Sequence, residues 1–373
     1  MSAQDKYARY QRQIQLKEFG KGAQDKLLNA KVLVIGAGGL GCPALQYLAA
    51  AGIGRIGIVD FDRVELSNLH RQILYTIDDI GLFKAEIAAK KLRLLNPEIS
   101  IDAYQYAINT NNALELISNY DLVIDGSDNF PTRYLVNDAC VILNKPMVYG
   151  AVVRFEGQVG VFNLETKDTK QKANYRDLFP LPPDSGSIPS CNEAGVLGVI
   201  PGIIGTMQAT EAIKIITRIG NPLSNKIVSY NALNNSFYDF EIRPAMLTKV
   251  EFPKNKPEFL AFDYALHCDP SAGRHQISVL DFNALRSREP LNIIDVREYG
   301  EIPGVHEFEH VKIPFSIFKE EMKRLTPERT FIVFCTSGKR SAQAVQILKN
   351  TFATCTAYSL EGGIENWKKN SDL

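Results

Sequence analysis

The chain has 373 residues, more than a single compact domain usually contains, so we expect two domains. Its 42 basic side chains are balanced by 42 acidic ones, which argues against a nucleic-acid partner or an acidic membrane surface. The polar N-terminus predicts no signal peptide, and the most apolar stretch, 194–205, is too short and too polar to span a membrane. Six scattered cysteines without a C-x-x-C pair predict no disulfide framework and favour a reducing, cytoplasmic location.

A glycine-rich turn follows the first predicted strand, the apolar β-branched run 32–35. It fits G-x-G-x-x-G with one additional glycine: Gly36, Gly38, Gly39 and Gly41. A helical pattern over 43–51 and a second strand over 56–59 complete a βαβ unit, whose helix N-terminus can approach phosphates closely. Asp60 ends that strand, where such folds place the acid that accepts from a ribose hydroxyl. The alternative is a turn without a ligand, but the order of elements favours a nucleotide site.

Two further groups of polar side chains are expected beside this nucleotide site. The periodicity predicts four elements: a helix over 84–95, a strand over 99–104, a helix over 110–118 and a strand over 122–124. Asn68 and Arg71 stand among alternating apolar residues, and Lys84 opens the first of these helices. Asp128 and Asn129 follow the last strand, and ligands of open α/β sheets bind outside such strand ends. We therefore expect all five side chains to contact the nucleotide.

These residue types distinguish between nucleotides. Arginine and lysine suit a polyphosphate, and an acid at a strand end suits Mg²⁺. Taken singly, Arg71, Lys84 or Asp128 could each belong to a surface ion pair. Together they favour Mg-ATP over NAD, because a simple dinucleotide dehydrogenase needs neither feature.

Several motifs in combination resemble the MoeB/ThiF/HesA family, relatives of the ubiquitin-activating enzymes. They are R-Y-Q-R-Q (9–13), G-A-G-G-L-G (36–41), D-F-D-R-V-E-L-S-N-L-H-R-Q (60–72), Lys84, D-G-S-D-N (125–129) and C-N-E-A-G-V (191–196). The resemblance implies a Rossmann-like, ATP-binding adenylation domain, which we place at 1–244. Such a domain uses Mg-ATP to adenylate the C-terminal glycine of a small ubiquitin-like sulfur-carrier protein that ends in Gly-Gly.

The resemblance also implies roles for individual residues. Phosphate contacts fall on three side chains: Asn68, Arg71 and Lys84. Asp60 resembles the ribose ligand, Gly39 contacts the nucleotide through its backbone, and Asp128 resembles the Mg²⁺ ligand. Arg12 would otherwise be interpreted as a solvated helix residue, but it matches an arginine that reaches into the partner subunit's site. The resemblance therefore implies a homodimer.

A long polar, proline-rich segment, 164–190, precedes Cys191, and loops of this length are usually functional or disordered. Cys191 lies just before an apolar helical stretch, and a helix N-terminus favours the thiolate needed for a transient acyl or disulfide link. In the family, a cysteine at this position has that role in some members and is dispensable in others. The alternative is an inert small residue at a helix start; we favour the functional interpretation.

The chain departs from the family at a metal site. Many relatives hold a structural zinc ion with two C-x-x-C pairs, but the corresponding stretches here read N-Y-R-D (174–177) and A-M-L-T (245–248). All four sulfurs are missing, and His267 with Cys268 falls short of a tetrahedral ligand set. We predict no zinc site.

A second domain, 276–373, is expected after a linker, 245–275, that loses periodicity and gathers prolines and lysines. A buried strand over 331–334 leads directly into a loop and then into a helix that continues to Leu348. The loop is C-T-S-G-K-R-S: Cys335, Thr336, Ser337, Gly338, Lys339, Arg340 and Ser341. Its N–H groups and the helix dipole can cradle an anionic sulfur. Residues 276–370, with G-G-I-E-N-W near the end, resemble the rhodanese sulfurtransferases.

Some cysteine phosphatases share this topology, but their loop has five residues between cysteine and arginine. Here there are four, and the tighter loop suits a persulfide better than a phosphate. Family members often carry arginine in place of Thr336, so the strength of sulfur-substrate binding stays open. Cys42, Cys140 and Cys355 fall in apolar patterns and are expected in the core.

The two resemblances together imply one reaction sequence. Cys335 would take sulfur as a persulfide from thiosulfate or from a cysteine desulfurase, and deliver it to the acyl-adenylate of the carrier. Cys191 would resolve an acyl-disulfide intermediate. The product would be a carrier thiocarboxylate for molybdopterin synthesis, our first choice, with a MoaD-like carrier, or for thiamine synthesis with a ThiS-like one. The alternatives are an NAD-dependent oxidoreductase with a regulatory rhodanese-like module, and a binding protein in which both sites are inactive.

Overall fold

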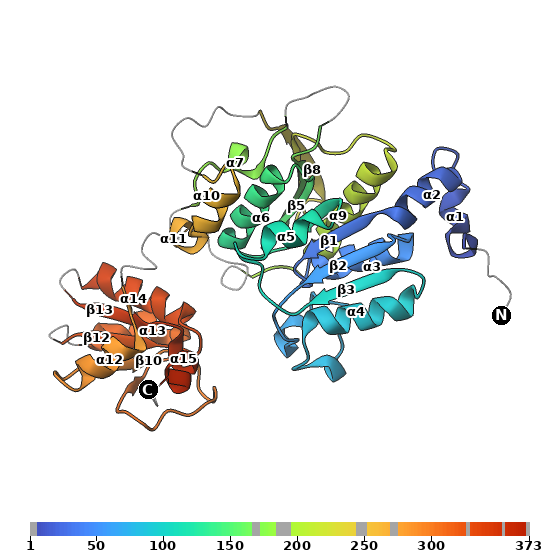
Figure 1. Ribbon diagram of the computed structural model, residues 1–373. Coiled ribbons are helices and arrows are strands. Elements are labelled where there is room, and N and C mark those ends of the chain that lie inside the picture. Colours follow the sequence, from blue (N-terminus) through green and yellow to red (C-terminus); the bar gives the residue numbers. More distant parts are fainter. Residues whose placement is uncertain are drawn as a thin grey trace. The chain divides into compact units, whose positions relative to one another are not determined.

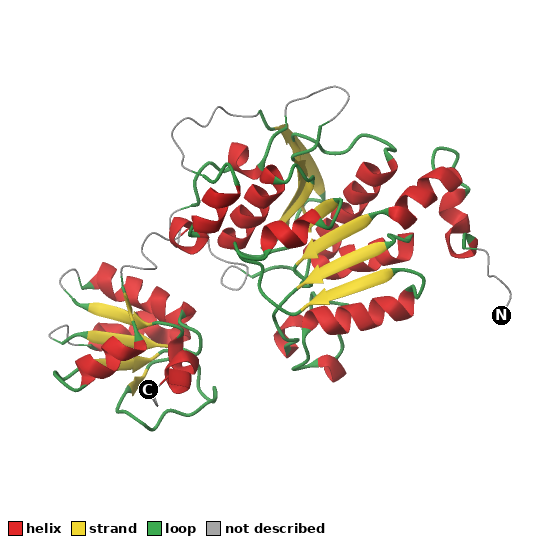
Figure 2. Ribbon diagram, in the orientation of Figure 1, coloured by secondary structure: helices red, strands yellow, loops and turns green. Residues whose placement is uncertain are grey.

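The computed structural model describes seven stretches of the chain: 6–165, 172–183, 195–243, 252–268, 275–325, 329–352 and 355–370, without the side chain of Lys339. The chain forms two compact units, Met1–Cys268 and Asp269–Leu373. In each unit, helices flank a central sheet (Figures 1 and 2). The α/β class predicted for both parts of the chain is therefore confirmed.

The sheet of the larger unit contains eight described strands in the order β3-β2-β1-β4-β5-β6-β7-β8. Their bounds are β1 (Lys31–Ile35), β2 (Arg55–Val59), β3 (Ser100–Tyr104), β4 (Leu122–Asp125), β5 (Met147–Val153), β6 (Glu156–Phe162), β7 (Lys226–Asn231) and β8 (Ser236–Glu241). From β3 to β5 the neighbours are parallel, and from β5 to β8 they are antiparallel. The parallel half is the Rossmann-like arrangement that the βαβ pattern predicts.

Helices cover both faces of this sheet (Figure 1). Their bounds are α1 (Gln11–Ile14), α2 (Gly20–Asn29), α3 (Gly41–Ala51), α4 (Lys84–Leu95), α5 (Ala113–Ser118), α6 (Phe130–Ile142), α7 (Tyr175–Leu178), α9 (Val199–Thr217), α10 (Lys256–Ala261) and α11 (Tyr264–Cys268). Short 3-10 turns lie at η1 (Ala8–Tyr10), η2 (Leu66–Asn68) and η3 (Ile77–Asp79). The core on one face contains side chains of α2, α3, α4 and α9, and the core on the other face contains those of α5, α6, α7, α10 and α11.

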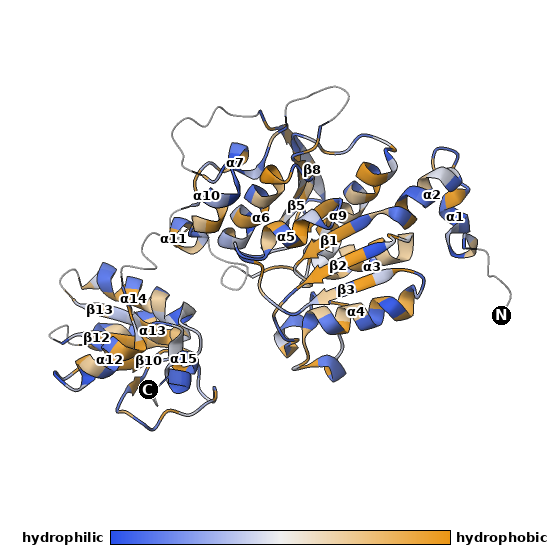
Figure 3. Ribbon diagram, in the orientation of Figure 1, coloured by the Kyte–Doolittle hydropathy of each residue, from blue (hydrophilic) through white to orange (hydrophobic). Residues whose placement is uncertain are grey.

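The central strand β1 shows why both faces are covered. Val32 and Val34 pack into one core, and Leu33 and Ile35 pack into the other. Successive side chains of a strand point to opposite faces, so an apolar run without alternation needs a partner layer on each side. Figure 3 shows β1 as a mostly apolar strand. Burying each such side chain contributes about 1.5–3 kcal/mol to stability, so this strand anchors the sheet.

Helix α9 is long and apolar enough to meet the length and composition criteria for a membrane span, and among the described residues it is the only such helix. Its buried polar side chains show that it is a core helix. Gln208 donates from Nε2 to the backbone oxygen of Asp125 in β4 at 2.7 Å, and Glu211 accepts from the backbone N–H of Leu223 at 2.8 Å. Polar groups of this kind fasten the helix to the sheet and the loops around it.

A buried ion pair fastens α7 and α11 to α6. Arg176 donates from Nε and Nη2 to the two carboxylate oxygens of Asp138, at 2.8 and 2.7 Å. The Tyr264 hydroxyl donates to the same carboxylate at 2.9 Å, and His267 Nε2 lies 3.3 Å from Arg176 Nη1. Burial alone would lower the pKa of Arg176, but its hydrogen bonds to Asp138 outweigh that effect and raise the pKa. The guanidinium therefore stays charged although both side chains of the pair are at most 2 % exposed.

The predicted polar loop, 164–190, and the predicted linker, 245–275, are thus ordered in part. Helix α7 lies within the first, and α10 and α11 lie within the second. An irregular linker was expected at 256–268, but Phe259 and Tyr264 are buried against α6 and hold these two helices on the larger unit. The domain boundaries predicted at 244 and 276 stay predictions.

The smaller unit has a parallel sheet in the order β11-β10-β12-β13-β9. Its elements are β9 (Gln276–Ile277), α12 (Val279–Arg286), β10 (Asn292–Asp295), β11 (Val311–Lys312), η4 (Phe315–Ile317), α13 (Phe318–Glu321), η5 (Met322–Arg324), β12 (Phe331–Phe334), α14 (Lys339–Thr351), β13 (Ala357–Leu360) and α15 (Gly363–Asn370). Side chains of β12 alternate between two cores, one with α13 and α14 and one with α12 and α15. The strand, cysteine loop and helix predicted at 331–348 are confirmed.

Replacing Arg176 with methionine should leave the Asp138 carboxylate buried without its cation, at a cost of about 3–5 kcal/mol. Unfolding in urea can be followed by circular dichroism, while the fluorescence of Trp367, the single tryptophan, reports on the smaller unit alone. We expect the circular-dichroism transition of the larger unit to move to lower urea and the Trp367 transition to stay in place.

Arg55→Met is the matched control, because Arg55 pairs with Asp102 where both side chains are about one third exposed. That variant should lose about 1 kcal/mol or less. Equal losses for the two arginine variants would show that the Arg176 pair contributes no more than a surface ion pair.

Candidate active sites

The glycine loop between β1 and α3 depends on a close backbone approach. A Cβ atom added to Gly41 would lie 2.0 Å from the backbone oxygen of Gly36, so no larger residue fits there. The N–H of Gly36 donates to Val59 in β2, and the N–H of Gly126 donates to Ile35 in β1, each at 2.8 Å. The loop therefore lies where the carboxyl ends of β1, β2 and β4 meet, as predicted for the nucleotide site.

Asp60 braces this loop. Its Oδ2 accepts from the backbone N–H of Ala37, and its Oδ1 accepts from the N–H of Asp62, each at 2.8 Å. Burial raises the pKa of Asp60, and the nearby charge of Lys84 opposes that rise. A carboxylate oxygen has two acceptor positions, so both oxygens can still accept from a ribose hydroxyl.

Lys84 is almost fully buried at the first turn of α4, with 5 % exposure. Its Nζ donates to Asp62 Oδ2 at 3.1 Å, and the Asp62 side chain is half exposed. An ammonium group has three donors, so two remain for other acceptors. Asp62 thus directs the lysine toward the same loop; no sequence pattern singled it out, although it lies inside the quoted D-F-D motif.

Asn68 and Arg71 lie in the segment between β2 and α4. The buried Asn68 closes a 3-10 turn, since its Oδ1 accepts from the backbone N–H of Glu65 at 3.2 Å. Arg71 donates from Nη1 to the backbone oxygen of Ser67 at 3.1 Å. A Cβ atom added to Gly39 would lie 3.6 Å from Arg71 Cγ, so the arginine stem passes over the glycine loop. The structure therefore brings Arg71 and the loop together.

Asp128 and Asn129 lie between β4 and α6 and are both exposed. Asn129 caps α6, because its Oδ1 accepts from the N–H of Thr132 at 3.0 Å, and its Nδ2 donates to Asp128 Oδ1 at 3.3 Å. Immediately before them, the buried Asp125 accepts from Arg133 Nε at 3.1 Å. That ion pair fixes the loop from which Asp128 projects, so the exposed carboxylate has a defined position.

Within one chain, Arg12 does not lie with the polar side chains around the glycine loop. It is exposed on α1. In Figure 2 the arrowheads of the parallel strands, where the glycine loop lies, point away from α1. The in-trans role that the resemblance implies for Arg12 stays a prediction.

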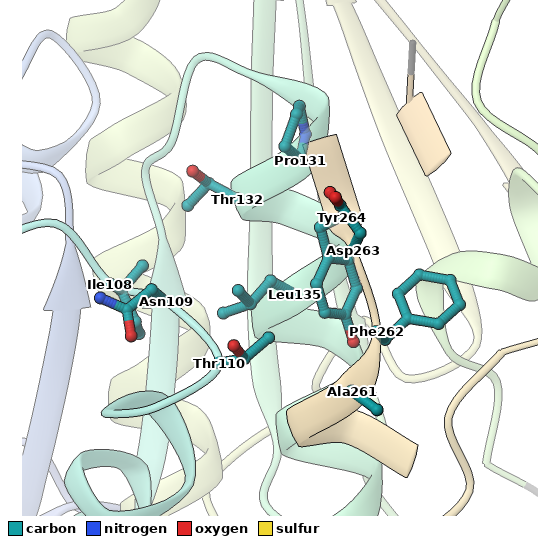
Figure 4. Close-up of a pocket in the computed structure, with 10 residues that line it drawn as sticks. All are labelled: Ile108, Asn109, Thr110, Pro131, Thr132, Leu135, Ala261, Phe262, Asp263 and Tyr264. Atoms are coloured by element: carbon teal, nitrogen blue, oxygen red, sulfur yellow. The ribbon is translucent and has the colours of Figure 1, made fainter. Parts of the chain in front are cut away.

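A cavity of about 380 Å³ lies beside the first turns of α6 (Figure 4). Its lining comes from the loop after β3, from α6 and from α10 and α11: 108–110, Pro131, Thr132, Leu135 and 261–264. None of the residues predicted to contact the nucleotide lines it. The cavity is therefore separate from the polar set at the strand ends.

The loop 335–341, which we call the persulfide loop, surrounds the sulfur of Cys335. The backbone N–H of Gly338 donates to Cys335 Sγ at 3.1 Å, and the Ser341 hydroxyl lies 3.6 Å from it. Helix α14 begins at Lys339 and directs its N-terminus toward the loop. The arrangement can stabilise a negative charge on the sulfur.

The motif G-G-I-E-N-W holds this loop from outside. The N–H groups of Ile364 and Glu365, at the start of α15, donate to the backbone oxygens of Cys335 and Thr336 at 2.9 and 3.2 Å. A Cβ atom added to Gly363 would lie 2.4 Å from the Cys335 oxygen, which explains the glycine. The sequence alone only matched this motif to a family, and the structure now shows that the motif packs against the loop of Cys335.

Other predicted residues lie elsewhere or outside the described part of the chain. Cys191 and the stretch 245–248 fall among residues that the structure does not describe. The core positions predicted for Cys42, Cys140 and Cys355 are confirmed, since all three are buried. Burial raises the pKa of Cys42 to about 12, so that thiol is protonated at neutral pH.

Comparison with known proteins decides the family. The model of the ThiF family matches residues 10–249, and the model of the rhodanese-like domain matches 278–370. The chain belongs to the ThiF family. The family predicted from the motifs, including the C-terminal rhodanese domain, is thereby confirmed.

Curated relatives span nearly the whole chain. Adenylyltransferase/sulfurtransferase MoeZ of Mycobacterium tuberculosis is 41% identical, over 98% of this chain and 94% of the relative. Adenylyltransferase and sulfurtransferase MOCS3 of Drosophila grimshawi is 37% identical, over 99% of this chain and 85% of the relative. The sulfur carrier protein adenylyltransferase of Thermus thermophilus is 52% identical, over 63% of this chain and 87% of the relative. The chain is accordingly an enzyme of the adenylyltransferase/sulfurtransferase class.

Solved structures of E. coli MccB share the fold of the larger unit. The structure of MccB with ATP has a TM-score of 0.55 at 26% identity and covers 65% of this chain and 74% of MccB. The structure of MccB with MccA-N7isoASN has a TM-score of 0.57 at 25% identity and covers 66% of this chain and 75% of MccB. The larger unit therefore has the fold of an ATP-bound relative, and the family to which the chain belongs uses ATP.

The position of the family's first C-x-x-C pair, 174–177, is described, and it holds the buried Arg176–Asp138 pair. Within the described stretches, no cluster of three or more His, Cys, Asp or Glu side chains could hold a metal ion. Burial, followed by the charge of Arg176, lowers the pKa of His267 and leaves its ring neutral at pH 7. The absence of zinc stays a prediction that metal analysis can test.

Metal analysis of the purified full chain should show no stoichiometric zinc, because a guanidinium group occupies the position of the first sulfur pair. Incubation with a chelator should leave the melting temperature unchanged, since no metal–ligand bonds would be lost. About one zinc ion per chain would mean that other residues have replaced the four missing sulfurs.

Proposed function

We propose that this enzyme uses Mg-ATP to adenylate the C-terminal glycine of a ubiquitin-like sulfur-carrier protein and then converts that carboxylate to a thiocarboxylate. One observation carries the proposal: a single chain combines cationic and acidic side chains around a glycine loop with a cysteine inside an anion-cradling loop. Relatives named sulfur carrier protein adenylyltransferase and adenylyltransferase/sulfurtransferase support both halves.

The first half joins two anions. The carrier's carboxylate oxygen attacks the α-phosphorus of ATP, and pyrophosphate leaves with the bonding electron pair, which gives an acyl-adenylate. We assign Lys84 and Arg71 to the phosphates, where their charges offset the repulsion and stabilise the developing pyrophosphate. The N–H groups of the glycine loop and Asn68 position the phosphates, and Asp60 positions the ribose. Positioning and electrostatics thus account for this step.

The donor set at the corner of α6 fits a Mg²⁺ ion bound together with the nucleotide. Magnesium usually takes one or two protein carboxylates and completes its shell with phosphate oxygens and water. Asp128 offers one exposed carboxylate in a fixed loop, with the amide of Asn129 beside it. When bound, the ion would neutralise charge on the polyphosphate.

The second half moves sulfur. The terminal sulfur of a Cys335 persulfide attacks the acyl carbon, and AMP leaves with the bonding pair, so the carrier is joined to Cys335 through an acyl disulfide. The Cys191 thiolate then attacks Cys335 Sγ, and the carrier leaves as a thiocarboxylate. The resulting Cys191–Cys335 disulfide needs two electrons from a cellular thiol before the next cycle.

Several finer assignments belong to the same proposal. We favour a MoaD-like carrier and molybdopterin synthesis over a ThiS-like carrier and thiamine synthesis, and we place the enzyme in the cytoplasm as a homodimer. The competing NAD-dependent oxidoreductase leaves Arg71, Lys84 and Asp128 unexplained as a set. A binding protein with two inactive sites leaves the Gly338 hydrogen bond to the Cys335 sulfur without a purpose.

Asp128→Ala should lower carrier-dependent exchange of labelled pyrophosphate into ATP by about a hundredfold or more, because the nucleotide loses its magnesium ligand. Glu115→Ala is the matched control, since Glu115 is an exposed acid on the neighbouring helix α5. Exchange near the wild-type rate in a folded Asp128→Ala protein would contradict the assignment.

Mixing Arg12→Ala protein with Asp128→Ala protein should restore part of the exchange, if Arg12 acts across a dimer. A mixed dimer then contains one complete site, whereas each variant alone contains none. Subunit exchange can be verified with two affinity tags; no recovery after verified exchange would count against a role in trans.

Cys335→Ala should abolish thiosulfate:cyanide sulfur transfer and leave pyrophosphate exchange intact, because the two reactions use different units. Cys191→Ala should retain both activities but give less carrier thiocarboxylate, and added small thiols should restore the yield. Mass spectrometry of the carrier separates these cases. Full thiocarboxylate formation by Cys191→Ala without an added thiol would assign Cys191 a structural role only.

A further inference from the structure

Glu301 holds the arginine of the persulfide loop, and no sequence pattern indicates this contact. Both Nη atoms of Arg340 donate to the Glu301 carboxylate, one to each oxygen, with Nη2 2.7 Å from Oε2. The Thr336 hydroxyl donates to the same Oε2 at 2.9 Å. Two parallel bonds between a guanidinium and a carboxylate form one of the stronger ion-pair geometries. Glu301 thus binds two side chains of the loop at once.

This pair is permanent at neutral pH. The hydrogen bonds from Arg340 lower the pKa of Glu301 to about 2, and the hydrogen bond to Glu301 raises the pKa of Arg340. Both side chains are about one third exposed, so solvent reaches the pair. The positive charge of Arg340 is therefore neutralised where a sulfur donor must approach Cys335.

A second carboxylate lies nearby. Glu298 accepts from the backbone N–H and the hydroxyl of Ser316, at 3.1 and 2.9 Å, and its charge also acts on Arg340. Thr336 adds a neutral hydroxyl at the position after the cysteine. Two carboxylates, those of Glu301 and Glu298, therefore act on the one arginine of the loop.

The charge of the donor then matters. Cys335 thiolate takes sulfur from thiosulfate by attacking its sulfane sulfur; the S–S bond breaks, and sulfite leaves with the electron pair. Thiosulfate and sulfite each carry two negative charges, whereas the persulfide of a thiol carries at most one on its sulfur. With a thiol persulfide, the terminal sulfur moves to Cys335 and the thiolate leaves. Repulsion from Glu301 acts twice as strongly on a dianion as on a monoanion.

We propose that Glu301 is a specificity-determining residue, which neutralises Arg340 and so disfavours dianionic sulfur donors relative to a singly charged thiol persulfide. The proposal rests on the sulfur-transfer half of the proposed function. The preferred sulfur donor of the persulfide loop is then a persulfide on a protein or a small thiol, and not free thiosulfate.

Glu301→Gln removes the charge and keeps the shape and one acceptor oxygen. At low ionic strength, kcat/KM for persulfide formation should rise about tenfold with thiosulfate, and clearly less with the monoanion benzenethiosulfonate. A second readout needs no sulfur transfer. The ratio of Cys335 alkylation rates with anionic iodoacetate and neutral iodoacetamide, measured on the Cys335 peptide by mass spectrometry, should also rise.

Two further variants isolate the cause. Glu321→Gln breaks another arginine–glutamate pair of the same unit, Arg324 with Glu321, and changes the net charge equally. It should leave both ratios unchanged. The double variant Glu301→Gln with Arg340→Gln should lose the gain of the single variant, because no arginine charge is released.

An unchanged iodoacetate-to-iodoacetamide ratio in folded Glu301→Gln protein would overturn the proposal, as would equal gains with dianion and monoanion. Trp367 fluorescence reports whether Glu301→Gln unfolds the unit. If it does, the salt dependence of the wild-type enzyme tests the proposal instead. Its thiosulfate kcat/KM should depend only weakly on salt, and a steep fall with salt would contradict the neutralisation of Arg340 by Glu301. If no donor forms a persulfide in any variant, the sulfur-transfer function fails, and the alkylation ratio still decides the role of Glu301.

Discussion

Both units place their reactive groups where a buried parallel strand ends and a helix begins. β1 leads into the glycine loop and α3, and β12 leads into Cys335 and α14. The first N–H groups of a helix have no partner within that helix, so a tight turn in front of it presents them to an anion. In the function we propose, that anion is a nucleotide phosphate in one unit and a charged sulfur in the other. Glycines allow the backbone to approach both turns closely: Gly41 packs against the oxygen of Gly36, and Gly363 packs against the oxygen of Cys335.

Ion pairs give these turns their position and their charge. Asp60 accepts one hydrogen bond from the glycine loop, at Ala37, and one from Asp62 in its own segment. Asp62 orients the buried Lys84, and Arg133 with Asp125 fixes the segment that carries Asp128. In the smaller unit, Glu301 both anchors the persulfide loop and cancels the charge of Arg340. The proposed adenylation site therefore has cationic groups that suit a polyanion, whereas the arginine charge at the proposed persulfide site is neutralised. This contrast matches substrates of different charge.

The sequence predicts helices, strands and local motifs, but it does not predict side-chain contacts between residues that are far apart in the chain. The helix expected over 84–95 is α4, and the strand and loop at Cys335 lie where the apolar run and its glycine place them. Glu301 and Arg340 are 39 positions apart, and Arg176 and Asp138 are 38 apart. Periodicity describes neighbours within one element, so it cannot pair such side chains. Helix α7 was missed for a related reason: its four residues lie within a polar segment, and its stability comes from the buried Arg176.

The central claim is that one chain both activates a carrier carboxylate and supplies it with sulfur. Intact-mass spectrometry of a Gly-Gly-ended carrier, after incubation with the wild-type enzyme, ATP, magnesium and a thiol-persulfide donor, tests it most directly. The account predicts a mass increase equal to the exchange of one oxygen for sulfur, which requires both ATP and the donor. A carrier that stops at the AMP adduct, or an exchange that proceeds without ATP, would contradict it.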